Sequence, residues 1–177
     1  MATVYFQRLP AGQKASTAAH RLLERVLGTP WTALEYHESG KPWLPGGPEF
    51  SISHTGAAVA VAIDESPVGV DVESLRPILN RLPERVLSQT EMTWFTERGR
   101  EPGDFFTLWT LKESYYKALG TGLPGFPNET SFFLERGMWK LSGEPWNFFV
   151  WEKNLLRIAL CSHAQQVELI EVNESLD

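Results

Sequence analysis

Residues 105–120, with the sequence FFTLWTLKESYYKALG, constrain the fold of this chain more than any other stretch. Apolar residues recur there at steps of three and four, no proline interrupts them, and Gly120 stands where a C-cap glycine is expected, so the stretch predicts a helix. Trp109, Glu113 and Lys117 are spaced four residues apart and therefore share one helix face. Taken alone, this carboxylate and amine are typical of a surface ion pair, so their role depends on the rest of the chain.

The overall composition excludes several classes of protein. The 177 residues suit one compact domain or two small halves that share a core. The single cysteine excludes an internal disulfide and a cysteine-based zinc site. The net charge of −6 argues against nucleic acid as the main partner. Because no apolar run approaches the roughly 20 residues that span a bilayer, and no secretory signal is visible, we expect a cytoplasmic protein without membrane contact.

The first part of the chain predicts a strand over 2–9, a helix over 14–27 that Gly28 ends, and a Gly/Pro-rich loop over 38–50. The next segment, FSISHTG at 50–56, predicts a strand that runs into a turn rich in hydroxyl groups. Exposed backbone N–H groups and small donors of this kind can hold phosphate. A structural hydrogen-bonding role for the histidine is an equally good interpretation.

Two apolar segments, AAVAVAI at 57–63 and VGVDVE at 68–73, flank the turn DESP and predict a β-hairpin. On the second strand Asp71 and Glu73 point to the same face and repel each other. A divalent cation such as Mg²⁺ would relieve this repulsion, because Mg²⁺ prefers hard oxygen ligands. The alternative is that the strand end is exposed and water solvates both carboxylates.

Farther along, the pattern predicts a helix over 84–99, with Asp104 as the N-cap of the following helix. The last third is typical of strands, which we expect at 131–135, 138–141, 147–152, 155–162 and 167–172. Residues 147–162 should form a hairpin. Two successive helix-then-hairpin units hint at an internal duplication.

Three of these segments together carry a family resemblance. FSISHTG at 50–56, GVDVE at 69–73 and WTLKESYYKALGTGL at 109–123 resemble, in this order and spacing, the 4′-phosphopantetheinyl transferase superfamily. The chain is most similar to the single-chain, pseudo-dimeric type that activates surfactin synthetase and related peptide, fatty-acid and polyketide synthases. ESGKPWLP at 38–45 also matches that type. The resemblance is good over residues 38–125 and weaker beyond them.

The resemblance implies an activity and a fold. Such enzymes transfer the 4′-phosphopantetheine arm of coenzyme A to a serine of an apo acyl or peptidyl carrier protein, depend on Mg²⁺, and release adenosine 3′,5′-bisphosphate. We therefore expect an α+β fold with two similar halves, 1–66 and 67–177, each of which packs a helix against a small antiparallel sheet. The active site should lie in the cleft between the halves, and the protein should be a monomer.

The resemblance also implies roles for individual residues. Asp71, Glu73 and Glu113 would bind Mg²⁺, and Glu113 is also the best candidate to accept the serine proton. These two roles of Glu113 compete, and the sequence does not rank them. Lys117 would stabilise the leaving bisphosphate, and Lys112 would contact phosphate.

On the coenzyme A side, His54 would contact the 3′-phosphate, with Ser53 and Thr55 beside it. Lys41 would lie near the adenosine end. Arg21 is the expected N-terminal cation, with Lys14 as its substitute. Two departures from the family pattern bear on this site. Val72 separates the two strand acids where some relatives have a third polar group, and the chain is shorter than most single-chain members.

The segment 76–100 is locally basic, with five arginines against three glutamates. We expect it to dock the acidic helix of the carrier protein, although a solvated surface of mixed charge is the alternative. Two other functions also remain open. One is a different Mg²⁺-dependent phosphoryl transferase or hydrolase that uses the same carboxylates, and the other is a non-catalytic coenzyme A- or nucleotide-binding module.

Overall fold

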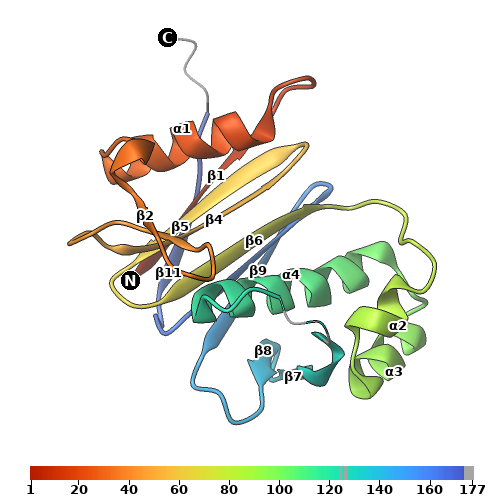
Figure 1. Cartoon of the computed structure of the whole chain (residues 1–177). Coiled ribbons are helices and arrows are strands. Elements are labelled where there is room, and N and C mark those ends of the chain that lie inside the picture. Colours follow the sequence, from red (N-terminus) through yellow and green to blue (C-terminus); the bar gives the residue numbers. More distant parts are fainter. Residues whose placement is uncertain (124, 126, 174–177) are drawn as a thin grey trace.

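The computed structural model describes residues 1–123, 125 and 127–173, and the fold is α+β (Figure 1). In chain order the first elements are β1 (Ala2–Arg8), α1 (Ala15–Leu27), the 3-10 helix η1 (Trp31–Ala33), β2 (Glu35–Tyr36), β3 (Pro42–Trp43), β4 (Glu49–Thr55) and β5 (Ala58–Asp64). They continue with β6 (Val68–Ser74), α2 (Leu82–Val86), α3 (Gln89–Glu97), α4 (Pro102–Leu119), η2 (Pro127–Glu129), β7 (Phe132–Glu135), β8 (Met138–Leu141), β9 (Asn147–Lys153), β10 (Leu156–Ser162) and β11 (Val167–Glu171).

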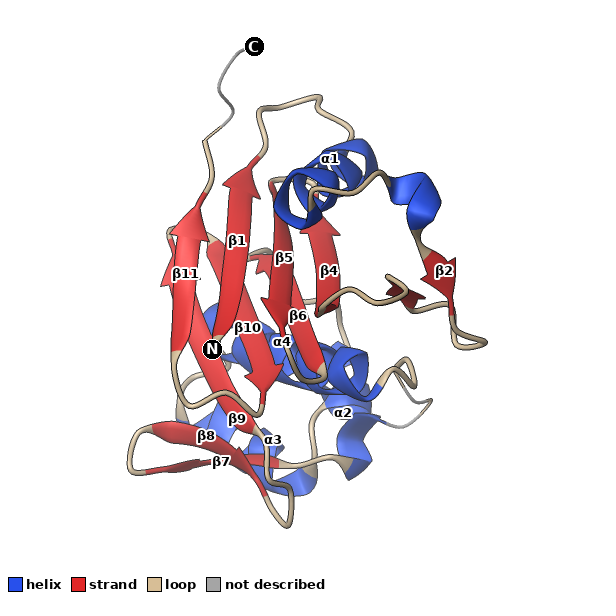
Figure 2. Ribbon diagram, turned by 90° about the vertical axis from the view of Figure 1, so that its left-hand side faces the viewer, coloured by secondary structure: helices blue, strands red, loops and turns tan. Residues whose placement is uncertain are grey.

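Two main sheets lie between two helical layers, as Figures 1 and 2 show from perpendicular directions. One sheet has the strand order β11-β1-β5-β4 and carries α1 on its outer face, whereas the other has the order β6-β10-β9 and carries α4. The apolar residues between the sheets come from alternating positions of facing strands, such as Val4, Ala60, Val70 and Ile158. This alternation is what lets each strand contribute to a core on both of its faces.

The predicted hairpin over 57–73 is wrong. β5 pairs with β4 and β1, so both of its edges are already occupied, and β6 pairs with β10 in the other sheet. The edges of β4 and β6 nevertheless meet. The hydroxyl of Ser51 accepts a hydrogen bond from the Val70 N–H (3.0 Å), and that of Ser53 accepts one from the Val72 N–H (3.3 Å). These serine side chains thus join the two sheets where backbone pairing stops.

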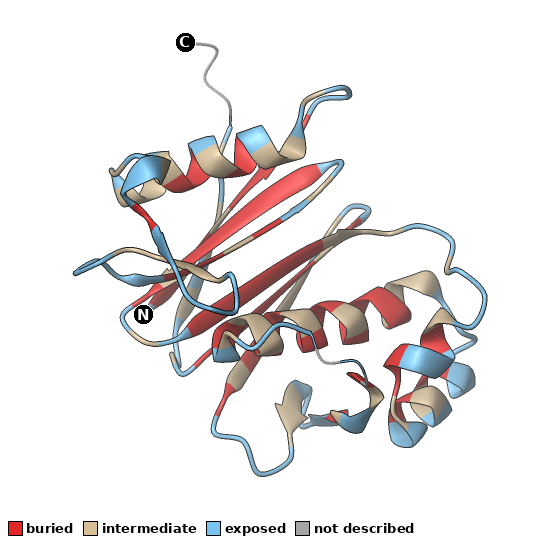
Figure 3. Ribbon diagram, in the orientation of Figure 1, coloured by how far each residue is buried: buried red, intermediate tan, exposed pale blue. Residues whose placement is uncertain are grey.

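A glycine fixes how closely α4 approaches β6. A Cβ atom on Gly69 would lie 1.9 Å from the carbonyl oxygen of Ser114, which is shorter than any real contact, so only glycine fits at this position. Because α4 rests directly on β6, its side chains lie beside those of the strand. In Figure 3 the buried length of β6 runs alongside the buried face of α4.

The helices α1 and α4 end at the predicted glycines, whereas α3 and α4 begin at residues other than those predicted. Gly28 and Gly120 end α1 and α4 in the left-handed conformation, as predicted. The predicted helix over 84–99 is instead two helices, because extended Ser88 starts a capping box for α3. Asp104 is not the N-cap of α4. Pro102 at the first helical position starts that helix earlier, with Glu101 as the N-cap.

All five strands predicted in the last third are present, and β9 and β10 form the predicted hairpin. The sequence did not predict where β11 goes: it returns to the first sheet and pairs in parallel with β1. The two sheets share one strand order. In each, the strand that comes first in sequence pairs with the second strand of a hairpin, which gives β1-β5-β4 in one sheet and β6-β10-β9 in the other. No helix among the described residues combines the length and the apolar character needed to cross a membrane.

Candidate active site

Three carboxylates line one hollow at the contact between β6 and α4. Asp71 and Glu73 come from β6 and Glu113 comes from α4, and all three line a hollow of about 370 Å³. The same hollow is bordered on its other side by α1, η1 and β4. The close packing of α4 on β6 and the four-residue spacing within α4 together bring these acidic groups to one place.

Asp71 is the most enclosed of the three, with 5% of its surface exposed. Its Oδ1 accepts hydrogen bonds from Ser53 Oγ and from Lys117 Nζ, both at 2.7 Å. Its Oδ2 is buried and has no hydrogen-bond partner among the described residues. A buried carboxylate oxygen without a donor is costly, so this atom is suited to an incoming cation.

Glu73 is held from two directions. Its Oε1 accepts a hydrogen bond from the indole N–H of Trp109 (3.1 Å), and its Oε2 accepts one from Arg76 (2.7 Å). Trp109 therefore orients an acidic side chain of β6 as well as packing on Phe105, at a ring separation of 6.2 Å.

Glu113 is half-buried and faces like charges. Burial raises its pKa above the usual range, and the nearby Asp71 and Glu73 raise it further, while Lys117 acts in the opposite direction. A carboxylate whose charged form is disfavoured accepts a proton more readily than an ordinary glutamate, and this is a property required of a general base.

The donor chemistry of this group suits Mg²⁺, which takes carboxylate oxygens together with water and substrate phosphate. The unpartnered Oδ2 of Asp71 and the mutual repulsion at Glu113 both fit an added positive charge. As the side chains stand, however, no three acidic, histidine or cysteine side chains of the described residues converge closely enough to form a ready metal site. The ammonium group of Lys117 neutralises Asp71 instead.

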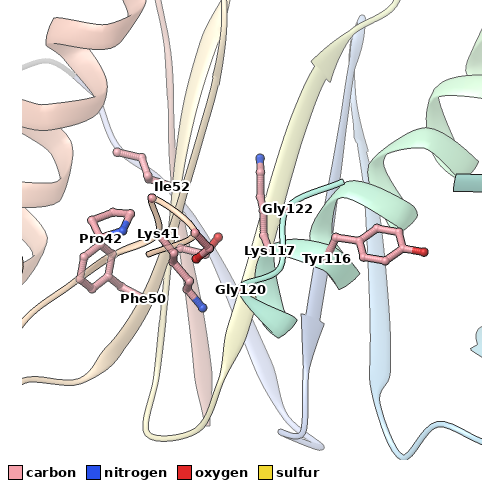
Figure 4. A pocket seen from close by; sticks show the side chains of 11 residues that line it. Lys41, Pro42, Phe50, Ile52, Tyr116, Lys117, Gly120 and Gly122 are labelled. Carbon is pink, nitrogen blue, oxygen red and sulfur yellow. The ribbon is translucent and has the colours of Figure 1, made fainter. Parts of the chain in front are cut away.

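A second hollow, of about 190 Å³, adjoins the first and shares Lys117 and Ile52 with it. Figure 4 shows Lys41, Pro42 and Phe50 on one side of this hollow and the α4 residues Tyr116 and Lys117 on the other. Burial lowers the pKa of Lys41, and Glu49 partly offsets this at 3.9 Å.

The predicted coenzyme A residues differ in their surroundings. His54 is exposed and lines the acidic hollow. The hydroxyl of Ser53 is engaged by Asp71, and that of Thr55 lies 3.0 Å from the hydroxyl of Ser74, so both side chains have partners within the protein. Arg21 is exposed on α1 and does not line the hollow beside it. Lys14 is exposed immediately before α1.

The expected phosphate contact of Lys112 is contradicted by the structure. Its ammonium group is fully buried on the far side of α4, where it lies 2.8 Å from Glu91 and donates to the carbonyl oxygens of Pro127 and Thr130. One helix residue corresponds to a rotation of about 100°, so Lys112 cannot share the face of Glu113. It fastens α3 and the segment before β7 to α4.

Sequence reasoning missed a ring pair that lines the acidic hollow. His20 of α1 stacks on Trp31 of η1 with ring centroids 3.6 Å apart and an angle of 18° between the planes. Nothing in the sequence around His20 distinguishes this histidine from the other polar residues of α1. No local signal marks the contact, because the two rings meet only after the chain has turned at Gly28 and Pro30.

Comparison with known proteins now identifies the family. The model of the 4′-phosphopantetheinyl transferase superfamily matches residues 67–160, which include β6, α4 and all three carboxylates. The chain belongs to the 4′-phosphopantetheinyl transferase superfamily. This family is one of enzymes, and its membership confirms the resemblance found in the sequence.

Individual relatives of this superfamily member match over part of their length. The chain is 37% identical over 89 residues to 4′-phosphopantetheinyl transferase gsp of Aneurinibacillus migulanus, which covers 49% of this chain and 38% of the relative. It is 38% identical over 90 residues to 4′-phosphopantetheinyl transferase Sfp of Bacillus subtilis (strain 168), covering 49% and 40%. The chain therefore aligns with less than half the length of these relatives.

Among solved structures, the holo-[acyl-carrier-protein] synthase of Thermotoga maritima gives a TM-score of 0.48 at 26% sequence identity. The alignment covers 54% of this chain and 61% of that one.

Proposed function

We propose that this protein transfers the 4′-phosphopantetheine arm of coenzyme A to a serine hydroxyl of an apo acyl or peptidyl carrier protein. The observation that carries the proposal is the meeting of Asp71 and Glu73 on β6 with Glu113 and Lys117 on α4 in one hollow. The matched family region contains all four residues.

In this reaction the serine oxygen attacks the phosphorus that bears the pantetheine arm. A new serine O–P bond forms, the bond between that phosphorus and the bridging pyrophosphate oxygen breaks, and adenosine 3′,5′-bisphosphate leaves with the electron pair. We assign Glu113 as the acceptor of the serine proton, because burial and two neighbouring carboxylates raise its pKa. Lys117 would stabilise the charge on the leaving phosphate.

We further propose that Asp71, Glu73 and Glu113 hold Mg²⁺. When bound, the ion would supply charge neutralisation at the pyrophosphate, which is the main catalytic requirement of phosphoryl transfer. On Asp71 the unpartnered Oδ2 would be the atom available to the ion, because Oδ1 is paired with Lys117.

Coenzyme A would lie across the two adjoining hollows, with its adenosine end near Lys41 and its 3′-phosphate near His54. Ser53 and Thr55 would shape this site through the backbone turn and through their contacts with Asp71 and Ser74. The side chain of Arg21 would have to reorient from the exposed surface of α1 to take part.

We propose that the chain is a monomeric pseudo-dimer with halves 1–66 and 67–177 and a substrate cleft between them. The shared strand order of β1-β5-β4 and β6-β10-β9, each with a helix on its outer face, supports this division. β11 is the exception, because it belongs to the second half in sequence and to the first sheet in space.

The proposal is tested by incubating the protein with coenzyme A, Mg²⁺ and several apo carrier proteins. The mass of each carrier is then measured by mass spectrometry. We expect a carrier to gain the mass of one phosphopantetheine group. Tight coenzyme A binding without transfer to any carrier would indicate a non-catalytic binding module. Cleavage of coenzyme A in the absence of a carrier would indicate a hydrolase.

A further inference from the structure

The stacked pair of His20 and Trp31 lines the acidic hollow, and the proposed reaction gives this pair no role. The two rings are nearly parallel at 3.6 Å, and the backbone N–H of Trp31 donates to the side chain of Glu24 at 2.7 Å, so η1 is tied to α1 at this point. Both side chains are partly exposed and line the hollow. The imidazole of His20 is thus held in place before any ligand arrives.

The hollow has two walls of opposite chemistry. The wall made by β6 and α4 carries three carboxylates, those of Asp71, Glu73 and Glu113, against the one ammonium group of Lys117. The wall made by α1, η1 and β4 carries His20, Trp31 and His54. An anionic group would be repelled by the first wall and could accept hydrogen bonds from the imidazoles of the second.

Two other side-chain nitrogen donors that line this hollow are engaged within the protein. The indole N–H of Trp109 donates to Glu73, and the ammonium group of Lys117 donates to Asp71. Among the hydrogen bonds of the described residues, none uses the imidazole of His20 or His54. The two imidazoles, together with the indole N–H of Trp31, are therefore the side-chain N–H donors that the wall made by α1, η1 and β4 offers to an anion.

We propose that His20, supported by Trp31, acts together with His54 as the binding site for the 3′-phosphate of coenzyme A. This inference rests on the proposed function, since it assigns one part of the same substrate. It replaces Arg21, which is exposed one residue farther along α1 and does not line the hollow. His20 then determines the preference for coenzyme A over its 3′-dephospho form.

The test compares coenzyme A with 3′-dephospho-coenzyme A as substrates for transfer to one carrier protein. For the wild type, kcat/KM should be higher for coenzyme A than for 3′-dephospho-coenzyme A. In His20→Ala, we expect kcat/KM for coenzyme A to fall by about tenfold or more, because a hydrogen bond to a charged group is lost, while the value for the dephospho form stays within about twofold. His20→Arg should restore the preference, since arginine binds phosphate well.

The chain offers a matched control in a second histidine–tryptophan stack. His163 lies on Trp146 with ring centroids 3.8 Å apart and an angle of 18°, and neither residue lines the acidic hollow. His163→Ala should leave kcat/KM unchanged for both coenzyme A and 3′-dephospho-coenzyme A. The proposed role of His20 would be overturned if His20→Ala lowered kcat/KM equally for coenzyme A and for 3′-dephospho-coenzyme A. It would also be overturned if the preference for coenzyme A did not change.

A binding experiment separates this inference from the proposed function. Calorimetry with adenosine 3′,5′-bisphosphate and adenosine 5′-monophosphate needs no carrier protein. If the wild type prefers the bisphosphate and His20→Ala loses that preference, the 3′-phosphate site stands even when no carrier is modified. If the wild type modifies a carrier but His20→Ala keeps its preference for the bisphosphate, the site is wrong and the proposed transfer stands. Failure of the wild type to prefer the bisphosphate would also reject the site.

Discussion

Asp71 shows how a single residue connects the two sheets to the chemistry of the site. One carboxylate oxygen binds Ser53 of β4 and Lys117 of α4, and the other is buried without a partner. Its position therefore depends on both sheets and on α4 at once. Removing this side chain should disturb the site more than the fold, because the packing around β6 is carried by its valines.

We predict that Asp71→Ala and Glu113→Ala each lower kcat/KM for transfer by at least about a hundredfold, because each removes charge that the transition state needs. Both variants should keep the wild-type circular dichroism spectrum. Glu152→Ala is the control, since this glutamate pairs with Arg157 on β10, away from the hollow. A near-wild-type rate at low Mg²⁺ in either variant would contradict the metal assignment.

Glu113 should also reduce the stability of the metal-free protein. Its folded-state pKa is raised, so the folded state binds a proton that the unfolded state has already lost, and stability falls as the pH rises through the window above the unfolded-state pKa. We therefore expect Glu113→Gln to raise the free energy of unfolding at neutral pH by about 0.5–2 kcal/mol, the usual gain from relieving strain at a functional site.

Urea unfolding without Mg²⁺ at several pH values measures this effect. The advantage of Glu113→Gln should shrink as the pH approaches about 4.3, where the unfolded glutamate is itself half protonated. An advantage that does not change with pH would mean that the like-charge repulsion is not its cause.

At the level of elements, two features fix the placement and rotation of α4. Gly69 lets the helix rest directly on β6, and the buried pair of Lys112 with Glu91 fastens its opposite side to α3. Glu91 also accepts hydrogen bonds from the backbone N–H groups of Ser88 and Phe132, so one carboxylate joins α3, α4 and β7. Glu113 and Lys117 face the hollow because Lys112 faces the core.

We predict that Lys112→Met lowers the free energy of unfolding by about 3–5 kcal/mol, because it leaves the buried charge of Glu91 without its partner. The double variant Lys112→Met/Glu91→Gln should lose less than the sum of the two single variants, since the charge is removed as well. Lys153→Met, a lysine change at the end of β9, should cost under about 0.5 kcal/mol. Additive losses in urea unfolding would show that the two side chains are not coupled.

At the scale of the whole molecule, the site lies where the first sheet with α1 meets the second sheet with α4. The basic segment 76–100 lies beyond the N-terminal end of α4, and three of its five arginines make ion pairs with acidic side chains of the described residues. Arg81 and Arg85 make no such pair within 4.0 Å in the described part of the chain. These two are therefore the best placed to receive an acidic partner.

We predict that the double charge reversal Arg81→Glu/Arg85→Glu raises KM for the carrier protein about tenfold and leaves KM for coenzyme A unchanged, because only the carrier would dock there. The effect should weaken as salt is added. The control Arg136→Glu/Lys153→Glu makes the same change in net charge at the β7–β8 and β9–β10 turns. An unchanged KM for the carrier would reject docking at this segment.

The sequence by itself determined the elements that carry the chemistry and the family to which the chain belongs. Local periodicity predicted the helix with Glu113 and Lys117 on one face and the strand with Asp71 and Glu73 on one face, because these patterns depend only on backbone geometry. It also correctly predicted the glycine-terminated ends of α1 and α4, whose conformation is local.

Only the tertiary structure decided which of these elements meet. It paired β6 with β10 rather than β5, turned Lys112 into the core, placed His20 on Trp31, and returned β11 to the first sheet. Each outcome depends on contacts between residues far apart in sequence, which compete for the same strand edge or the same buried volume. Periodicity gives the face of an element, but the partner of that face is set by packing across the whole molecule.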